Sequence, residues 1–127
     1  ALLAGSSRWF FWLETLKFIK EKPLLGYGLD CLGPEFFKVG IDYDKPHCEP
    51  MQFAAELGLP AAVAYLTSLI TFVVTYFKKK ISDPLVIGLV CTVGAYICSS
   101  LFGNTMFYTT PFFFMIFGMA TNVLKRA

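Results

Sequence analysis

The stretch LGLPAAVAYLTSLITFVVTYF at residues 57–77 decides the fold of this chain, and three lysines at 78–80 follow it directly. It contains no charged residue. As an α-helix it reaches about 31 Å, which is enough to cross the hydrocarbon core of a bilayer. The sequence therefore predicts a membrane-spanning helix here, within an all-α integral membrane protein.

Two more apolar segments predict a second and a third span at about residues 84–103 and 107–124. No charged residue lies between positions 84 and 124, and a soluble core does not hide so long a stretch. Small or polar residues at helical spacing predict faces where helices meet inside the membrane. These faces are formed by Gly88, Cys91, Ala95 and Cys98 in the second span and by Thr67, Thr71 and Thr75 in the first.

The composition divides the chain into two parts. Apolar residues make up 56% and charged residues only 16%, and the mean hydropathy is +0.59. Residues 1–56 hold six of the basic and eight of the acidic residues. We therefore expect a polar outer segment at 1–56 and membrane-spanning helices at 57–127. The net charge of +2, without a basic cluster, argues against nucleic-acid binding.

A charged, amphipathic helix is predicted at about residues 7–22, where Ser6 or Ser7 can cap its start. Its charges are too many for a span. Two positions fit this helix: it lies in the membrane interface, or it packs on its own protein. The apolar side is formed by Trp9, Phe10, Leu13, Leu16 and Ile19.

Residues 23–50 predict irregular structure. The segment 23–35 holds three glycines and two prolines, which is typical of loops and tight turns. The acidic segment 36–50 follows, and from Met51 the pattern becomes helical. Cys31 and Cys48 can form a disulfide in an oxidising compartment. The cysteine spacing predicts no zinc site.

The basic residues near the span ends predict the orientation. Five lie on one side of the predicted spans, at 78–80 and 125–126, whereas only Lys45 lies close to a span on the other side. The positive-inside rule then puts the lysine triplet and the C-terminus in the cytoplasm, and residues 1–56 and 104–110 outward. The chain begins at Ala1, and we expect it to be a piece of a longer protein.

Two motifs resemble the C-terminal part of the O-antigen ligase and O-antigen polymerase family. The first is SSRWFFW (6–12), with PLLGYG (23–28) after a helix, and the second is KPHCEPMQFAAELGLP (45–60). In that family an outward loop carries an Arg…Trp helix, a Pro-x-x-Gly-x-Gly turn and a His-Asn…Glu-x-Gly motif, before two or more spans. The chain departs from the pattern where Cys48 replaces the usual Asn or Ser, Pro50 a common aromatic residue, and Ala61 a frequent Gly.

The resemblance implies a glycosyl- or oligosaccharide-transferring enzyme of the GT-C type in the bacterial inner membrane. Such an enzyme takes a glycan from an undecaprenyl-diphosphate carrier at the outer face and passes it to a lipid or glycan acceptor, without a cofactor or a metal. Members have further spans, so we expect this chain to need those helices and to be inactive alone. The alternative is a non-catalytic or transport membrane protein whose outer loop binds a partner. The predicted spans hold no ionisable residue that would favour ion coupling.

Five residues are candidates for the site. The planar guanidinium of Arg8 suits the leaving diphosphate, because it binds phosphate oxygens in pairs and stays charged. The only histidine, His47, suits the acceptor hydroxyl, because imidazole exchanges protons near neutral pH. Lys45 can add a second positive charge, and Tyr27 can stack on a sugar ring. Glu56 matches the Glu of the family and is expected to bind substrate or to brace the chain where it enters the first span.

Each candidate also has a structural interpretation. Arg8 can anchor a helix at lipid headgroups, and His47 can be structural or solvated. Asp42, Asp44 and Glu49 can orient His47, or they can simply solvate the loop.

Overall fold

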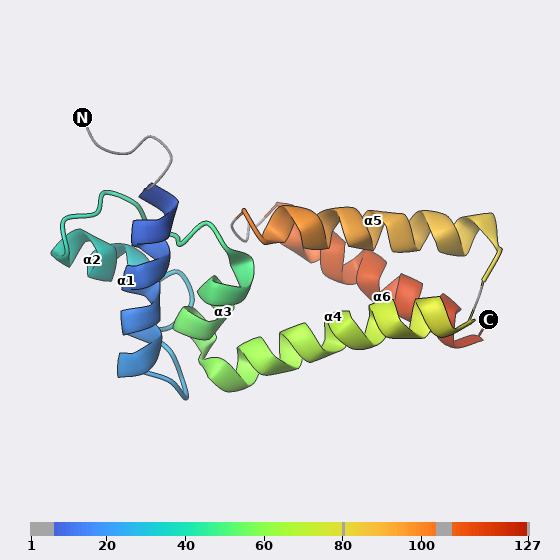
Figure 1. Ribbon diagram of the computed structural model, residues 1–127, viewed down its shortest axis with the longest axis horizontal. Coiled ribbons are helices and arrows are strands. Elements are labelled where there is room, and N and C mark those ends of the chain that lie inside the picture. Colours follow the sequence, from blue (N-terminus) through green and yellow to red (C-terminus); the bar gives the residue numbers. More distant parts are fainter. Residues whose placement is uncertain (1–6, 80, 104–107, 127) are drawn as a thin grey trace.

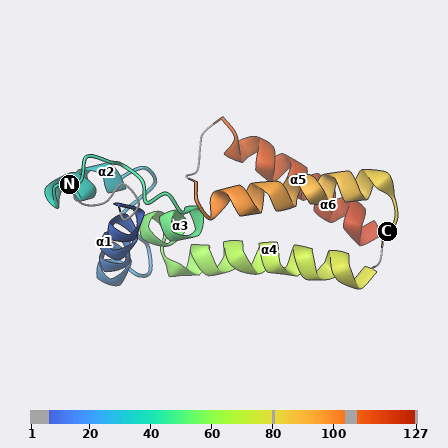
Figure 2. The same ribbon diagram turned by 45° about the horizontal axis from the view of Figure 1, so that its top comes forward.

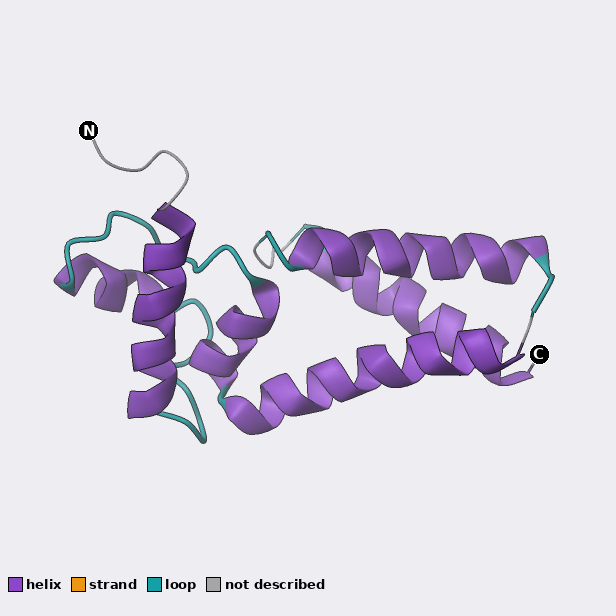
Figure 3. Ribbon diagram, viewed as in Figure 1, coloured by secondary structure: helices purple, strands orange, loops and turns teal. Residues whose placement is uncertain are grey.

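The computed structural model describes residues 7–79, 81–103 and 108–126, with the backbone alone for Ser7 and Arg8. Within these ranges every regular element is a helix, which confirms the all-α prediction (Figures 1 and 3). The six helices are α1 (Ser7–Glu21), α2 (Leu32–Lys38), α3 (Glu49–Leu57), α4 (Leu59–Lys79), α5 (Pro84–Ser100) and α6 (Thr110–Arg126).

The helices form two groups. Helices α1–α3 gather at one end of the molecule, and α4–α6 run lengthwise as a bundle (Figure 1). Helix α1 runs across the end of this bundle, and it keeps that direction when the view is turned (Figures 1 and 2). If the bundle axis is the membrane normal, α1 therefore lies parallel to the membrane plane.

Helix α4 begins and ends two residues later than the predicted span. Gly58, with φ +91°, separates it from α3, and glycine adopts this conformation at low cost. Among the described helices, α4 alone is long and apolar enough to cross a membrane. Helices α5 and α6 have 17 residues each, or about 25 Å of helix. The second and third spans therefore stay predictions. Residues 104–107, which include part of the predicted outward link at 104–110 and the start of the third span, lie outside the described residues.

One face of each long helix is buried in a common core. Helix α4 buries apolar residues at intervals of three and four, the spacing of one helix face. At the far end of the bundle, Lys79 Nζ donates hydrogen bonds to the carbonyl oxygens of Leu124 at 2.8 Å and Lys125 at 3.1 Å. A lysine in this position satisfies carbonyls that the last turn of α6 leaves unpaired. The core is formed by Tyr65, Leu69, Phe72, Val86, Val93, Phe113, Ala120 and Leu124.

The predicted helix-contact faces point outward. Cys91, Ala95 and Cys98 on α5 are exposed, and a Cβ added to Gly88 would meet nothing within 4 Å. On α4, Thr67 and Thr71 are exposed as well. These faces therefore make no close helix contact within the described part of the chain.

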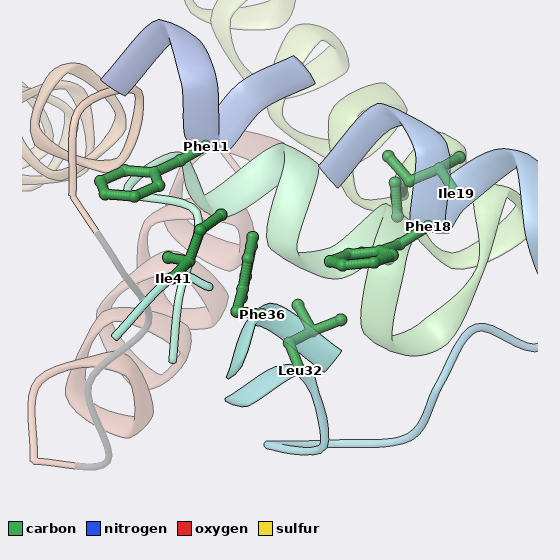
Figure 4. Packing of buried hydrophobic residues seen from close by; sticks show 9 residues of the cluster. Phe11, Phe18, Ile19, Leu32, Phe36 and Ile41 are labelled. Carbon is green, nitrogen blue, oxygen red and sulfur yellow. The ribbon is translucent and has the colours of Figure 1, made fainter. Parts of the chain in front are cut away.

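Helix α1 has two apolar faces. Phe11, Phe18 and Ile19 are buried with residues of α2 and α3 in a second core, so the helix does pack on its own chain (Figure 4). The predicted apolar side is mostly outside that core: Trp9 is 62% exposed, and Leu13 and Leu16 are exposed too. An interfacial position for this outer face stays a prediction.

The prediction that residues 23–50 are irregular was wrong for α2. Leu32 and Phe36, which lie four residues apart, are both fully buried against α1 and α3. Gly33 and Pro34 lie within this seven-residue helix, and both residue types are typical of loops. Tertiary burial, rather than local propensity, therefore stabilises α2.

Candidate functional site

The two family-like motifs contact each other through their main chains. The N–H of Tyr27 donates to the carbonyl of Ala55 at 2.9 Å, and the N–H of Gly28 donates to the carbonyl of Glu56 at 2.9 Å. Gly26 lies directly against the backbone of Glu56, where a Cβ would collide. The Pro-Leu-Leu-Gly-Tyr-Gly turn and the end of α3 thus form one unit, and its close approach requires glycine.

His47 lies in an aromatic corner between α1 and the loop before α3. Its ring centroid is 6.1 Å from that of Phe11 and 5.9 Å from that of Tyr43, and its side chain is half-buried. The backbone of His47 has φ +53°, a left-handed conformation that is uncommon outside glycine. Such conformations concentrate at functional sites, because surrounding contacts must hold them in place.

Helix α1 holds the His47 loop. The indole Nε1 of Trp12 donates a hydrogen bond to the carbonyl of Pro46 at 3.1 Å, and Pro46 is buried. The backbone of Arg8 lies one turn before Trp12, and residues four apart share a helix face. The fold thus brings the backbone of Arg8 to the face of α1 that contacts the histidine loop, while its side chain lies outside the described atoms.

Lys45 and Glu56 belong to a neighbouring group of charges. Lys45 Nζ pairs with Asp30 Oδ1 at 3.3 Å. Glu56 is buried and accepts a hydrogen bond from Gln52 Nε2 at 3.1 Å. Burial raises the pKa of Glu56, and the hydrogen bond from Gln52, the backbone N–H of Asp30 and the charge of Lys45 act in the opposite direction. Glu56 therefore braces the junction between the glycine turn and α3.

Tyr27 does not present a free ring to a sugar. Its hydroxyl donates to the carboxylate of Glu21, and Lys22 Nζ lies 4.1 Å above its ring. The Glu21 hydrogen bond, followed by burial, raises the pKa of Tyr27 to about 12. The ring also packs edge-on against Phe18. A sugar could stack here only after displacing the lysine.

The structural role of Glu49 was not predicted from the sequence. It is 1% exposed, and its carboxylate accepts hydrogen bonds from the hydroxyls of Tyr96 at 3.0 Å and Tyr65 at 3.4 Å. Ser100 adds a further side-chain hydrogen bond, and the Tyr96 hydroxyl also meets Thr110 at 3.0 Å. Burial is the main cause that raises the pKa of Glu49.

The Glu49 contacts link two parts of the chain. The Glu49 carboxylate accepts from the tyrosines of α4 and α5, so it joins the segment before α4 to the helix bundle. The sequence contains one indication of this contact. Tyr65 and Tyr96 lie within apolar helices, and a buried hydroxyl needs a hydrogen-bond partner.

Asp42 and Asp44 lie on either side of Tyr43, whose ring contacts that of His47. Asp42 and Asp44 are exposed and line an open cavity of about 450 Å³ together with Phe37 and Tyr43. Two carboxylates make that cavity unfavourable for a diphosphate, because like charges repel.

The cysteines make no bridge, since Cys31 and Cys48 are both free thiols. Burial raises the pKa of Cys48, which keeps this thiol protonated. Within the described ranges, no three His, Cys, Asp or Glu side chains come together as metal ligands would.

The candidate site is therefore a junction at the N-terminal end of α4, built from α1, the glycine turn and α3. No protein-family model matches this chain, and no curated protein or solved structure matches it either.

Proposed function

We propose that this chain is the C-terminal part of a membrane enzyme of the O-antigen ligase or polymerase type. The whole enzyme transfers a glycan from an undecaprenyl-diphosphate carrier to a lipid or glycan acceptor at the outer face of the bacterial inner membrane. Helices α4, α5 and α6 span the membrane, residues 1–56 face outward, and the C-terminus lies in the cytoplasm. The remaining helices of the full-length protein pack on the threonine face of α4 and on the small-residue face of α5.

One observation carries this proposal. The two motifs that resemble the family are separated in sequence, yet their main chains are hydrogen-bonded at Tyr27–Ala55 and Gly28–Glu56. The contact lies next to the start of α4, which among the helices of residues 7–79, 81–103 and 108–126 is the one with the length and apolar composition of a span. Resemblance in sequence and contact in space thus coincide at the level where a membrane surface is expected.

The proposed chemistry needs a proton acceptor and a positive charge. The acceptor hydroxyl oxygen bonds to the anomeric carbon of the glycan, while the bond from that carbon to the carrier diphosphate breaks. The His47 imidazole takes the hydroxyl proton, and its ring packs against those of Phe11 and Tyr43. Arg8 stabilises the negative charge that builds on the leaving diphosphate. Lys45, held by Asp30, supplies positive charge nearby.

The test is His47→Ala in the full-length protein, with glycan transfer measured per amount of inserted protein. We expect transfer to fall by about 10²–10⁴-fold, the usual loss when a general acid or base is removed. His47→Gln should retain slightly more, because an amide can still orient a hydroxyl. The matched control is Val39→Ala, an exposed position in the segment that leads to His47.

The two roles of His47 predict different results. A structural histidine would lower protein level and total transfer together, with unchanged transfer per inserted molecule. Near-normal specific transfer by His47→Ala would remove this residue from the proposed chemistry. Equal losses in the Val39→Ala control would show that the segment as a whole, and not the imidazole, is required.

A further inference from the structure

The turn between α1 and α2 exposes two consecutive leucines. Leu24 is 71% exposed and Leu25 is 86% exposed. Isolated exposed apolar residues are ordinary on protein surfaces, but two neighbouring ones at the tip of a turn form a small apolar patch. The tip is flanked by Lys20 and Lys22, which are both exposed.

Backbone contacts fix this tip to the start of α4. The N–H of Leu59, the first residue of α4, donates to the carbonyl of Pro23 at 2.8 Å. The N–H of Gly26 donates to the carbonyl of Lys22 at 3.1 Å and closes the turn. Gly58 lies so close to the carbonyl of Leu24 that a Cβ would collide with it. The leucines are therefore held in place relative to α4.

The tip lies where the apolar surface of α4 begins. Leu59 is 44% exposed and Val63, one turn further, is 60% exposed, so this side of α4 presents apolar side chains from its first turn. In Figure 1 the turn after α1 lies beside this first turn of α4. A bilayer that surrounds α4 has its outer boundary at this level.

We propose that Leu24 and Leu25 insert into the outer leaflet of the bilayer that α4 crosses. This inference rests on the membrane position of α4 in the proposed function, and it does not depend on glycan transfer. Apolar side chains enter the acyl region, whereas lysines beside them suit anionic headgroups. Lys22 stays above the Tyr27 ring at 4.1 Å, so its charge is kept close to the boundary.

The choice of lipid over a protein partner follows from position. The leucines are continuous with the exposed apolar side of α4, which lipid covers wherever α4 is not packed on another helix. A second copy of the chain bound at these leucines would have to displace the lipid headgroups that surround the start of α4. Lipid therefore meets both surfaces without a further binding event.

The experiment uses the full-length protein reconstituted in vesicles of phosphatidylethanolamine and phosphatidylglycerol, with every cysteine replaced. Single cysteines are then introduced as Leu25→Cys, Tyr43→Cys and Ile70→Cys, and each is labelled with an environment-sensitive fluorophore. Tyr43 is 57% exposed in the outer segment, and Ile70 is 62% exposed near the middle of α4. The replacements in this chain are Cys31→Ser, Cys48→Ser, Cys91→Ala and Cys98→Ala, and the helix content of each variant is checked by circular dichroism.

We expect the label at position 25 to lose most of its emission to lipids with a quencher near the headgroup, and little to iodide in water. The label at position 43 should behave in the opposite way, and the label at 70 should respond to a deep quencher. Iodide quenching at 25 with lipid quenching at 70 overturns the insertion and leaves the span intact. Protection of 25 from both quenchers means that protein covers the tip, which also overturns it. Iodide quenching at 70 overturns the span itself and the insertion with it.

Discussion

Replacing Glu49 by alanine should loosen the junction between the outer segment and the helix bundle. The carboxylate accepts hydrogen bonds from Tyr96 at 3.0 Å and Tyr65 at 3.4 Å in a site that is 1% exposed. Without Glu49 the Tyr96 hydroxyl keeps Thr110 as a partner and the Tyr65 hydroxyl keeps Ser100, so neither is orphaned. Two lost hydrogen bonds at about 0.5–1.5 kcal/mol each cost about 1–3 kcal/mol, and we expect about 2 kcal/mol. Glu49→Gln keeps the shape and one acceptor oxygen, and should cost about 1 kcal/mol.

The measurement is the free energy of unfolding of the detergent-solubilised protein, followed by circular dichroism and tryptophan fluorescence. The matched control is Glu35→Ala, which also removes a carboxylate from the first turn of a short helix. Glu35 makes a surface pair with Lys38 at 2.8 Å, and such pairs contribute about 0–1 kcal/mol. Equal unfolding free energies for Glu49→Ala and Glu35→Ala would refute the assignment of the junction to Glu49.

The pH dependence gives an independent check on the same residue. Because burial raises the pKa of Glu49 in the folded protein above its ordinary 4.5, the folded state holds this proton to higher pH than the unfolded state does. The contribution is therefore fully present below about pH 4.5 and is lost as the pH rises through the folded pKa. Glu49→Gln should flatten this decline, and Glu56, whose pKa is also raised, accounts for the part that remains. An unchanged slope in Glu49→Gln would contradict the prediction.

Three more outcomes follow from the structure. Arg8→Lys in the full-length protein should lose most glycan transfer, because charge remains while bidentate geometry goes, and wild-type transfer would remove Arg8 from the site. A cysteine at the exposed Lys78 should resist an impermeant thiol reagent added outside intact cells, and labelling there would invert the proposed orientation. Gly58→Ala should destabilise the protein by about 3 kcal/mol or more, because a φ of +91° adds strain to a collision with Leu24. The control Gly40→Ala, with φ +79° and open space around it, should cost about 1 kcal/mol, and equal losses would contradict the close-approach explanation.

Local patterns predicted the long helices well. The helix at 7–22 and the apolar stretch at 57–77 lie within two residues of α1 and α4, because periodicity and charge mark such elements directly. The break at Gly58 was hidden, since an uncharged stretch gives no information about a positive φ. Helix α2 was missed for a related reason: its seven residues contain Gly33 and Pro34, and only burial of Leu32 and Phe36 stabilises it.

Long-range contacts could not be derived from spacing. Glu49 and Tyr96 are 47 positions apart, and nothing near either residue indicates the other. The resemblance gave the order of the glycine turn and the His47 motif along one loop, but it did not predict that Gly26 touches the backbone of Glu56. Likewise, Tyr27 was expected to stack on a sugar. The spacing of five residues between Lys22 and Tyr27 did not predict that the lysine covers this ring.

The outward seam of α5 has a practical consequence. Cys91 and Cys98 are exposed and lie seven residues apart, so their thiols sit about 10 Å apart along one side of the helix. The two thiols can therefore locate a helix that packs on this side of α5 in the proposed full-length protein. Single cysteines introduced at successive positions of a neighbouring helix would form a disulfide with Cys91 or with Cys98, at positions two turns apart. The pair that forms would report both the identity of the neighbour and its direction.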